Sequence, residues 1–211
     1  MAKSPAKRRE RRKESRPSEL LAAAIELFVE RGFAATRLED VAARAGVSKG
    51  TLYLYYSGKD ELFKAVVREG IVPAIAEAET LVENFTGSSS ELLRAVVFGI
   101  WGNVGSSLPS GIPKLIMAES RNFPDLARFY YEEVILRAFA MASAVLRRGI
   151  RQGEFRELDI DPTARAIIGP PLLLMLWRHS FQFQESEPLD AQRYLDSCIS
   201  LIVDGLRAGG P

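Results

Sequence analysis

The chain has 211 residues, of which 47% are hydrophobic and 26% charged, and its formal net charge at neutral pH is +1. This composition is typical of a soluble globular protein with one large or two modest domains, and it excludes a chain that is disordered throughout. The single cysteine, Cys198, excludes an internal disulfide framework, and its helical context favours a small buried hydrophobe. No apolar run reaches about 18 residues, so we expect no membrane segment and a cytoplasmic location.

The charge is concentrated at the N-terminus. Residues 1–16 carry eight lysines and arginines against two glutamates, a net charge of +6, which leaves −5 for the rest of the chain. A basic arm of this kind can follow a phosphate backbone or enter a minor groove; the alternative is a solvated, disordered tail. No apolar stretch follows the charges, so the segment is not a secretion signal.

A first helix is predicted from Pro17 to Arg31. Pro17 suits the first turn of a helix, and Gly32 is the expected C-terminal stop. We expect this helix to have a structural role, because its apolar residues would form a small core that holds the recognition helix at a fixed angle. That core is predicted to contain Leu21, Ile25, Phe28, Phe33, Val41 and Leu52.

Two short helices joined by a tight turn are predicted next. Thr36, followed three residues later by Glu39, predicts a capping box at the start of the first helix, and Gly46 predicts its end. Ser48 is a good N-cap for the second helix. Short helix, glycine-containing turn and short helix are typical of a helix-turn-helix, whose second helix enters the major groove of DNA.

The second of these helices, Ser48 to Tyr56, suits that role. Leu52 and Tyr56 lie four residues apart and are expected to pack inward, while Gly50 would let the backbone approach a phosphate. The other side chains offer donors on the outward face: Lys49, Thr51, Tyr53 and Tyr55.

Residues 20–65 resemble the DNA-binding domain of the TetR/AcrR family of bacterial transcriptional regulators. The resemblance rests on four motifs in the family's order and spacing: Gly32-Phe33, residues 36–42, residues 45–53 and residues 59–63. It implies an all-helical homodimer that represses transcription and leaves its operator when a small ligand enters the C-terminal domain. It also implies that the last two helices form the dimer interface.

Lys59 is predicted to contact a DNA phosphate. It lies in the first turn of the next helix, where a cation opposes the helix dipole unless a phosphate neutralises both. The alternative is a solvated lysine, and the resemblance favours the phosphate contact.

The rest of the chain shows helical patterns and no strand pattern. A helix from Lys59 towards Glu79 is expected to be kinked or interrupted at Pro73, and Pro170 and Pro171 should kink a later helix or divide it in two. The predicted fold class is all-α, with a homeodomain-like three-helix unit before a helical domain. The expected boundaries are a basic arm at 1–16, a helix-turn-helix domain at 17–70 and a ligand-binding and dimerisation domain at 71–211. The longest helix is predicted at residues 124–151, and the last two, at 162–183 and 188–206, are predicted to be the most apolar.

The C-terminal region is expected to bind a small, largely apolar effector and to pair with a second copy through residues of about 162–184 and 188–208. Its aromatic and methionine side chains are typical of pocket linings, although each one taken singly is more typical of a core. The candidate ligand contacts are Trp101, Asn103, Met117, Phe139, Trp177 and His179.

The sequence therefore predicts a homodimeric, ligand-responsive repressor of a palindromic operator in double-stranded DNA. We expect no cofactor, no metal and no catalytic residue, because one histidine and one cysteine leave little for catalysis. The alternative is a module that binds DNA without sequence preference. Thr51, helped by Lys49, is predicted to read bases, and the other DNA contacts are predicted to be to phosphate. The whole predicted DNA-binding set is Thr36, Ser48, Lys49, Gly50, Thr51, Tyr53, Tyr55 and Lys59.

Overall fold

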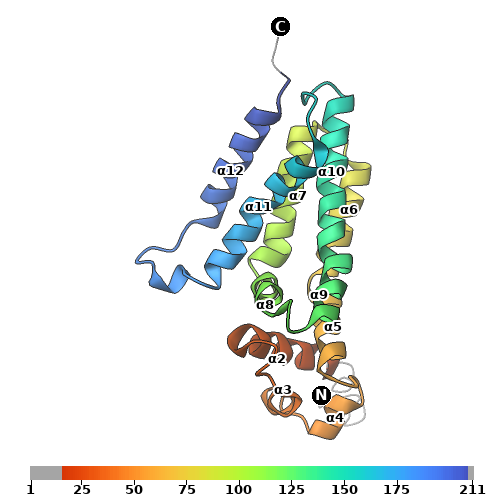
Figure 1. The fold of residues 1–211 in the computed structure, drawn as a ribbon, viewed down its shortest axis with the longest axis vertical. Coiled ribbons are helices and arrows are strands. Elements are labelled where there is room, and N and C mark those ends of the chain that lie inside the picture. The colour runs from red at the N-terminus through yellow and green to blue at the C-terminus, as the bar shows by residue number, and fades with distance from the viewer. Residues whose placement is uncertain (1–15, 209–211) are drawn as a thin grey trace, which may run out of the picture. The chain divides into compact units, whose positions relative to one another are not determined.

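The computed structural model describes residues 16–208, and their contacts divide the chain after Glu69 into two compact units. All regular elements in this range are helices, and the only bridge is an isolated antiparallel one between Phe155 and Arg207 (Figure 1). The predicted all-α class is therefore confirmed. Residues 1–15 of the predicted basic arm lie outside the described residues.

The first unit is built on a small aromatic core. The rings of Phe28, Phe33 and Phe63 lie with their centroids 5.4–5.9 Å apart, and the six side chains predicted for this core are all buried. Ring pairs at this separation add to the stabilisation from buried area. The helices of this unit are α2 (Arg16–Arg31), α3 (Leu38–Arg44), α4 (Lys49–Tyr53) and α5 (Lys59–Gly70).

Glycines end two of these helices, as predicted. Gly32 follows α2 with φ +85° and Gly46 follows α3 with φ +66°, both in the left-handed region that costs glycine little. After α3, the Val47 N–H donates to the Ala42 carbonyl at 2.9 Å and the Gly46 N–H donates to the Ala43 carbonyl at 3.1 Å. These two bonds form a Schellman motif, which fixes the turn between α3 and α4.

The second unit contains two π-helical segments and two 3-10 turns among its α-helices. In order they are α6 (Val72–Asn84), α7 (Ser89–Ile100), η1 (Trp101–Gly105), η2 (Leu108–Gly111), α8 (Ile112–Glu119), α9 (Pro124–Tyr130), η3 (Tyr131–Ile135), α10 (Leu136–Arg151), α11 (Ile160–Arg178), η4 (Gln182–Gln184) and α12 (Ala191–Leu206). None of the helices within residues 16–208 combines the length and apolar character that a membrane crossing requires.

The proline predictions had different outcomes. The helix predicted from Lys59 towards Glu79 is interrupted, as expected: Ile71 has φ −122° and Pro73 lies in the first turn of α6. Pro170 and Pro171 were predicted to kink a helix or divide it in two; they lie inside α11, which runs from Ile160 to Arg178 as one helix, so the division is wrong and the kink stays a prediction. A helix can tolerate prolines in its interior when its packing outweighs the two lost hydrogen bonds.

The predicted long helix at residues 124–151 is present as one helical run with a π-helical segment in the middle. α9 passes directly into η3 and then into α10. Its predicted inward face is buried, with Leu126, Tyr130 and Val145 at most 5% exposed. A π-helical turn inserts a residue into the hydrogen-bond ladder and shifts the faces on either side of it, which apolar periodicity does not reveal.

Within the second unit, α10 packs against α6, α7 and α11, while α12 lies at the edge beside α11 and α7 (Figure 1). Residues 154–156, which follow α10, bind the start of α7 and the end of α12. The Glu154 carboxylate accepts hydrogen bonds from the backbone N–H of Ser89 at 2.7–2.8 Å, which caps α7. The Arg156 N–H donates to the Leu206 carbonyl at 2.9 Å and so fixes the end of α12.

Candidate nucleic-acid interface

Thr36 precedes α3 but does not cap it. Its hydroxyl donates to the carbonyls of Gly32 at 2.7 Å and Leu27 at 3.2 Å, and its side chain is only 1% exposed. The N-cap of α3 is Arg37, which makes no side-chain capping bond, so the predicted Thr36–Glu39 capping box is wrong. Carbonyls at the end of α2 compete for the same hydroxyl. Thr36 therefore fixes the α2–α3 turn, and the phosphate contact predicted for the helix N-terminus beside it stays a prediction.

Ser48 caps α4 as predicted. Its Oγ accepts a hydrogen bond from the Thr51 N–H at 3.1 Å and lies 2.9 Å from the Thr51 hydroxyl. The two hydroxyls therefore bind each other at the helix N-terminus. Since α4 is only five residues long, this cap supplies a large share of its local order.

The recognition helix packs inward on one side and is exposed on the other. Leu52 is fully buried, and burial raises the pKa of the half-buried Tyr56 to about 12. Tyr53 and Tyr55 are 45% and 36% exposed, so both residues belong to the exposed side. The division between a packed and an exposed face agrees with the prediction.

Lys49 is held by a carboxylate from the preceding helix. Its ammonium forms an ion pair with Glu39 and lies 5.7 Å from the centroid of the Tyr53 ring. The Lys49 hydrogen bond lowers the pKa of Glu39, and the same bond raises the pKa of Lys49. A phosphate that binds Lys49 must therefore compete with Glu39. No sequence signal indicated this pair, because its members lie ten positions apart on two helices.

Lys59 faces the protein in this structure. Its ammonium donates to the carbonyls of Phe33 at 2.7 Å, Ala34 at 3.1 Å and Thr36 at 3.1 Å, and it lies 4.5 Å from the centroid of the Phe33 ring. An ammonium has three donors, and here three carbonyls accept them. The arrangement gathers the loop between α2 and α3 onto the start of α5. Phosphate contact by Lys59 stays a prediction, and such a contact would have to replace some of these bonds.

Leu54 is an exposed residue that the sequence analysis did not single out. It follows α4 directly and is 83% exposed, although it keeps helical backbone angles. An informative signal was available: Leu52 faces the core, and a residue two positions later in a helix points about 200° away from it. Leu54 therefore lies on the outward side of α4.

The six candidate ligand contacts are spread over the second unit. Trp101 is buried, but Met117 is 57% exposed and Trp177 is 37% exposed. Asn103 donates to Glu77 at 3.2 Å, and the Phe139 ring lies under the Arg165 guanidinium, 4.8 Å from its central carbon.

The last of the six, His179, is engaged within the unit. Its Nε2 lies 2.8 Å from the Ser110 hydroxyl. Burial and the charges of Arg178 and Lys114 hold the pKa of this ring below its ordinary value. His179 is therefore a half-buried residue with a structural partner, and its role in ligand binding stays a prediction, as it does for the other five.

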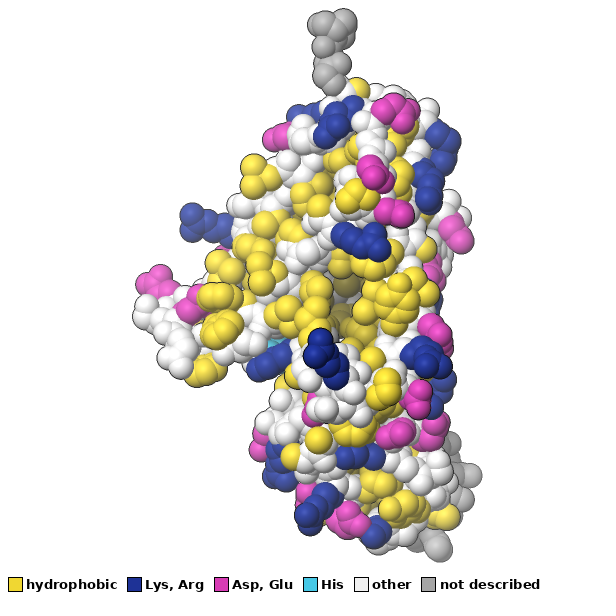
Figure 2. All heavy atoms as spheres, viewed as in Figure 1, with side chains coloured by type: hydrophobic (Ala, Val, Ile, Leu, Met, Phe, Trp, Pro, Cys, Tyr) yellow, Lys and Arg dark blue, Asp and Glu magenta, His cyan; other side chains and the backbone are white. Residues whose placement is uncertain are grey.

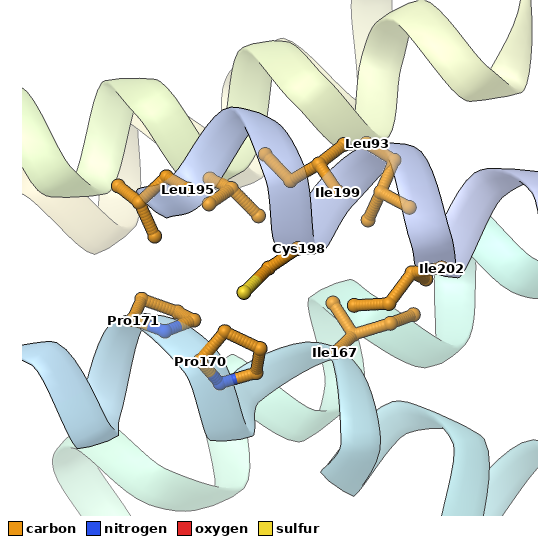
Figure 3. Close-up of a pocket in the computed structure, with 9 residues that line it drawn as sticks. Leu93, Ile167, Pro170, Pro171, Leu195, Cys198, Ile199 and Ile202 are labelled. Atoms are coloured by element: carbon orange, nitrogen blue, oxygen red, sulfur yellow. The ribbon is translucent and has the colours of Figure 1, made fainter. Parts of the chain in front are cut away.

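A small cavity lies between α7, α11 and α12. Its volume is about 10 Å³, enough for one water molecule, and none of the six candidate ligand contacts lines it. Figure 3 shows the Cys198 sulfur directed towards Pro170 and Pro171 across this space. Cys198 is partly buried, in keeping with its predicted role as a small hydrophobe.

A short capped helix held on an aromatic core, with polar and apolar side chains on its outer face, defines a DNA-binding protein of the helix-turn-helix class. Residues 20–66 match the family model described as bacterial regulatory proteins, tetR family. Residues 109–204 match the model described as the C-terminal domain of AefR-like transcriptional repressors. The chain belongs to the TetR family and is a DNA-binding transcriptional regulator.

Relatives extend this result along the chain. The HTH-type transcriptional repressor KstR2 of Mycobacterium tuberculosis is 26% identical over 198 residues, which cover 93% of this chain and 95% of the relative. The uncharacterised HTH-type regulator YdeS of Bacillus subtilis is 30% identical over 165 residues, 78% of this chain and 80% of the relative.

Solved structures have the same fold. The structure of M. tuberculosis KstR2, described as a ketosteroid transcriptional regulator, superposes with a TM-score of 0.73 at 25% identity and covers 92% of this chain and 96% of that one. The B. subtilis regulator FadR, solved with stearoyl-CoA, superposes with a TM-score of 0.70 at 21% identity and covers 90% of this chain and 99% of that one.

Proposed function

We propose that the protein is a homodimeric repressor that binds a palindromic operator and is released from it by a small, largely apolar effector. In this proposal residues 17–70 read DNA, residues 71–211 bind the effector and the second copy, and the basic residues of the arm add affinity through phosphates. The observation that carries the proposal is the exposed outer face of α4 on the first unit, which we call the head. The chain also exposes an apolar strip on its last two helices, formed by Leu173 and Trp177 on α11 and Leu201 on α12.

The DNA-reading part is supported by the way the head is constructed. The Ser48 cap, the left-handed Gly46 and the buried Leu52 fix α4 without using its outward side chains. Tyr53, Tyr55 and a released Lys49 would hold phosphates, and Gly50 leaves the backbone open, since a Cβ there would approach only the Ser48 Oγ, at 3.8 Å. Such contacts position a head, while base contacts give it sequence preference.

The dimer part is supported by the apolar strip on α11 and α12. Leu173 and Trp177 lie one turn apart on α11, and Leu201 on α12 is 75% exposed. Hydrophobic side chains gather over these helices in Figure 2. A second copy packed on the strip would form a four-helix bundle, and two heads about 34–36 Å apart would read successive major grooves as a palindrome.

Oligomeric state tests this interface directly. Leu201→Glu places a charge in the centre of the proposed interface, and we expect a monomer in sedimentation velocity together with loss of operator binding. Leu136→Glu is the matched control, because it makes the same change at a 44% exposed leucine of α10, a helix outside the proposed interface. A dimer that persists in Leu201→Glu would place the interface elsewhere.

The effector part rests on the apolar interior of the second unit. The cavity between α7, α11 and α12, about 10 Å³, is too small for such an effector, so in this proposal binding moves helices apart. A ligand that stabilises such an opened state would favour a head spacing that no longer fits the operator. The two solved relatives support an apolar effector, since one is described as a ketosteroid regulator and the other was solved with stearoyl-CoA.

The first experiment is selection of bound DNA from a random pool at physiological salt, followed by sequencing. Enrichment of a palindrome would support a dimeric, specific reader, and the enriched site then serves to screen steroids, fatty acids and acyl-CoAs by release. If nothing is enriched and binding only weakens as salt rises, the protein is the non-specific alternative.

A further inference from the structure

The outward face of α4 and the turn after it is apolar at its centre. Leu54 is the most exposed large hydrophobic side chain of the described residues, at 83%. Its backbone angles, φ −69° and ψ −23°, continue the helix, and its N–H donates to the carbonyls of Gly50 and Thr51, both at 3.3 Å. Residues three and four positions apart share a helical face, so Gly50, Thr51 and Leu54 form one surface.

This surface offers methyl groups in place of hydrogen-bonding groups. The Thr51 hydroxyl lies 2.9 Å from the Ser48 Oγ and is engaged at the helix N-terminus, which leaves the methyl as the apolar group of a partly exposed side chain. Beside it, Gly50 adds no side chain, and Leu54 supplies two more methyls. Tyr53 and Tyr55, the sequence neighbours of Leu54, are exposed as well.

The side chains that usually read bases through paired hydrogen bonds are missing from this segment. Residues 48–56 contain no Arg, Asn, Gln, Asp or Glu, and the one cation, Lys49, is paired with Glu39. In the major groove, thymine is the base that presents a methyl group, at C5, and apolar side chains recognise it by contact. An exposed leucine next to a threonine methyl matches that feature.

We propose that the recognition helix identifies its operator chiefly through thymine C5-methyl groups, which contact Leu54 and the Thr51 methyl. This inference rests on the proposed function, because it presupposes a specific operator, and it deepens that function by naming the feature of the base pair that is read. Leu54 is then the residue that determines specificity, and each half-site contains at least one thymine whose methyl group contributes to binding.

The test replaces single thymines of the selected operator by uracil, which removes the methyl and leaves base pairing and every hydrogen-bonding group unchanged. Affinity is measured by fluorescence anisotropy at fixed salt. Burying one methyl on binding corresponds to about a four-fold change, equivalent to ~0.8 kcal/mol. We expect such a loss at one or two positions per half-site and none at the other thymines.

Protein variants assign the effect to the side chain. Leu54→Ala should lose most of the preference for thymine over uracil at the sensitive position, and it should melt at the wild-type temperature because Leu54 is exposed. Thr51→Val keeps the methyl and should keep the discrimination. Leu108→Ala, a truncation of a 40% exposed leucine on η2, is the matched control and should behave as wild type.

A further experiment separates the contribution of the methyl group to affinity from that of the rest of the base. Placing a C·G pair at the sensitive position should weaken binding, and 5-methylcytosine in that pair should recover about the same four-fold. The inference is overturned if uracil is tolerated at every position, or if Leu54→Ala prefers thymine as strongly as wild type does. Failure of the selection to enrich any site would overturn the proposed function instead, before any uracil is introduced.

Discussion

Replacing Lys59 by methionine would remove an ammonium that three carbonyls share. Methionine keeps most of the apolar stem, so the loss falls on the polar interactions of the ammonium, among them the bonds to Phe33, Ala34 and Thr36 and the attraction of the charge to the Phe33 ring. A hydrogen bond to a charged group contributes about 1.5–3 kcal/mol when buried. The Ala34 carbonyl is exposed and can turn to water, so we expect the head to lose about 2–4 kcal/mol.

The assay is urea unfolding of the whole chain, followed by far-UV circular dichroism and by tryptophan fluorescence. Both tryptophans, Trp101 and Trp177, lie in the second unit, so a loss of helix signal that fluorescence does not follow reports the head. Lys64→Met is the matched control on the same helix. It breaks an exposed pair with Glu61, 2.8 Å long, and should change the free energy of unfolding by no more than ~0.5 kcal/mol.

The same variant separates the two roles of Lys59. If the ammonium holds the loop, Lys59→Met shifts the unfolding of the head in the absence of DNA. If Lys59 instead serves phosphate, the urea midpoint is unchanged and affinity falls alike for all sequences. That second result would refute the loop-holding role and restore the prediction made from the sequence.

Three further predictions concern charge. Glu39→Gln frees Lys49 from its ion pair and should tighten binding to operator and random DNA alike, by about two- to five-fold, with a steeper salt dependence of the dissociation constant. The pKa of His179 lies below its ordinary value of 6.5, so as pH falls below 6.5 the unfolded chain takes up the proton first. The free energy of unfolding should therefore decrease as the pH is lowered in this range, by more in wild type than in His179→Gln. Equal pH dependence in the two proteins would show that His179 contributes nothing to it. Deleting residues 1–15, which carry most of the basic arm, should weaken all DNA binding and flatten its salt dependence without changing the selected sequence; a changed sequence would mean that the arm reads bases.

The structure of the helix-turn-helix unit was largely predictable, because the sequence signals for its helix ends and caps are local. Gly46 ends α3 and Ser48 caps α4 through groups that lie within a few residues of each other, so their identities determine the geometry. Thr36 shows where this fails. Its pattern with Glu39 was a valid capping signal, yet the carbonyls of Leu27 and Gly32, up to nine positions back, took the hydroxyl. A tertiary partner overrides a local one whenever it offers a buried acceptor.

The candidate effector contacts were much less predictable, for a physical reason. An apolar side chain that lines a pocket and one that fills a core have the same chemistry, and only the packing of the helices separates them. The two π-helical segments, η1 and η3, rotate the faces of the helices that follow them and so blur the periodicity on which the sequence analysis relied. Trp101 lies at the start of one of them and is buried, whereas Met117 and Trp177 are exposed.

The opening of the helices proposed above would also limit how tightly an effector binds. If the second unit binds an effector from an opened arrangement of its helices, the apparent affinity is the intrinsic affinity multiplied by the population of that arrangement. An apolar effector offsets part of the free energy of opening, because it covers the apolar side chains that opening exposes. Mutations that loosen the helices without touching an effector should therefore strengthen its binding and weaken repression together, since both depend on the same equilibrium.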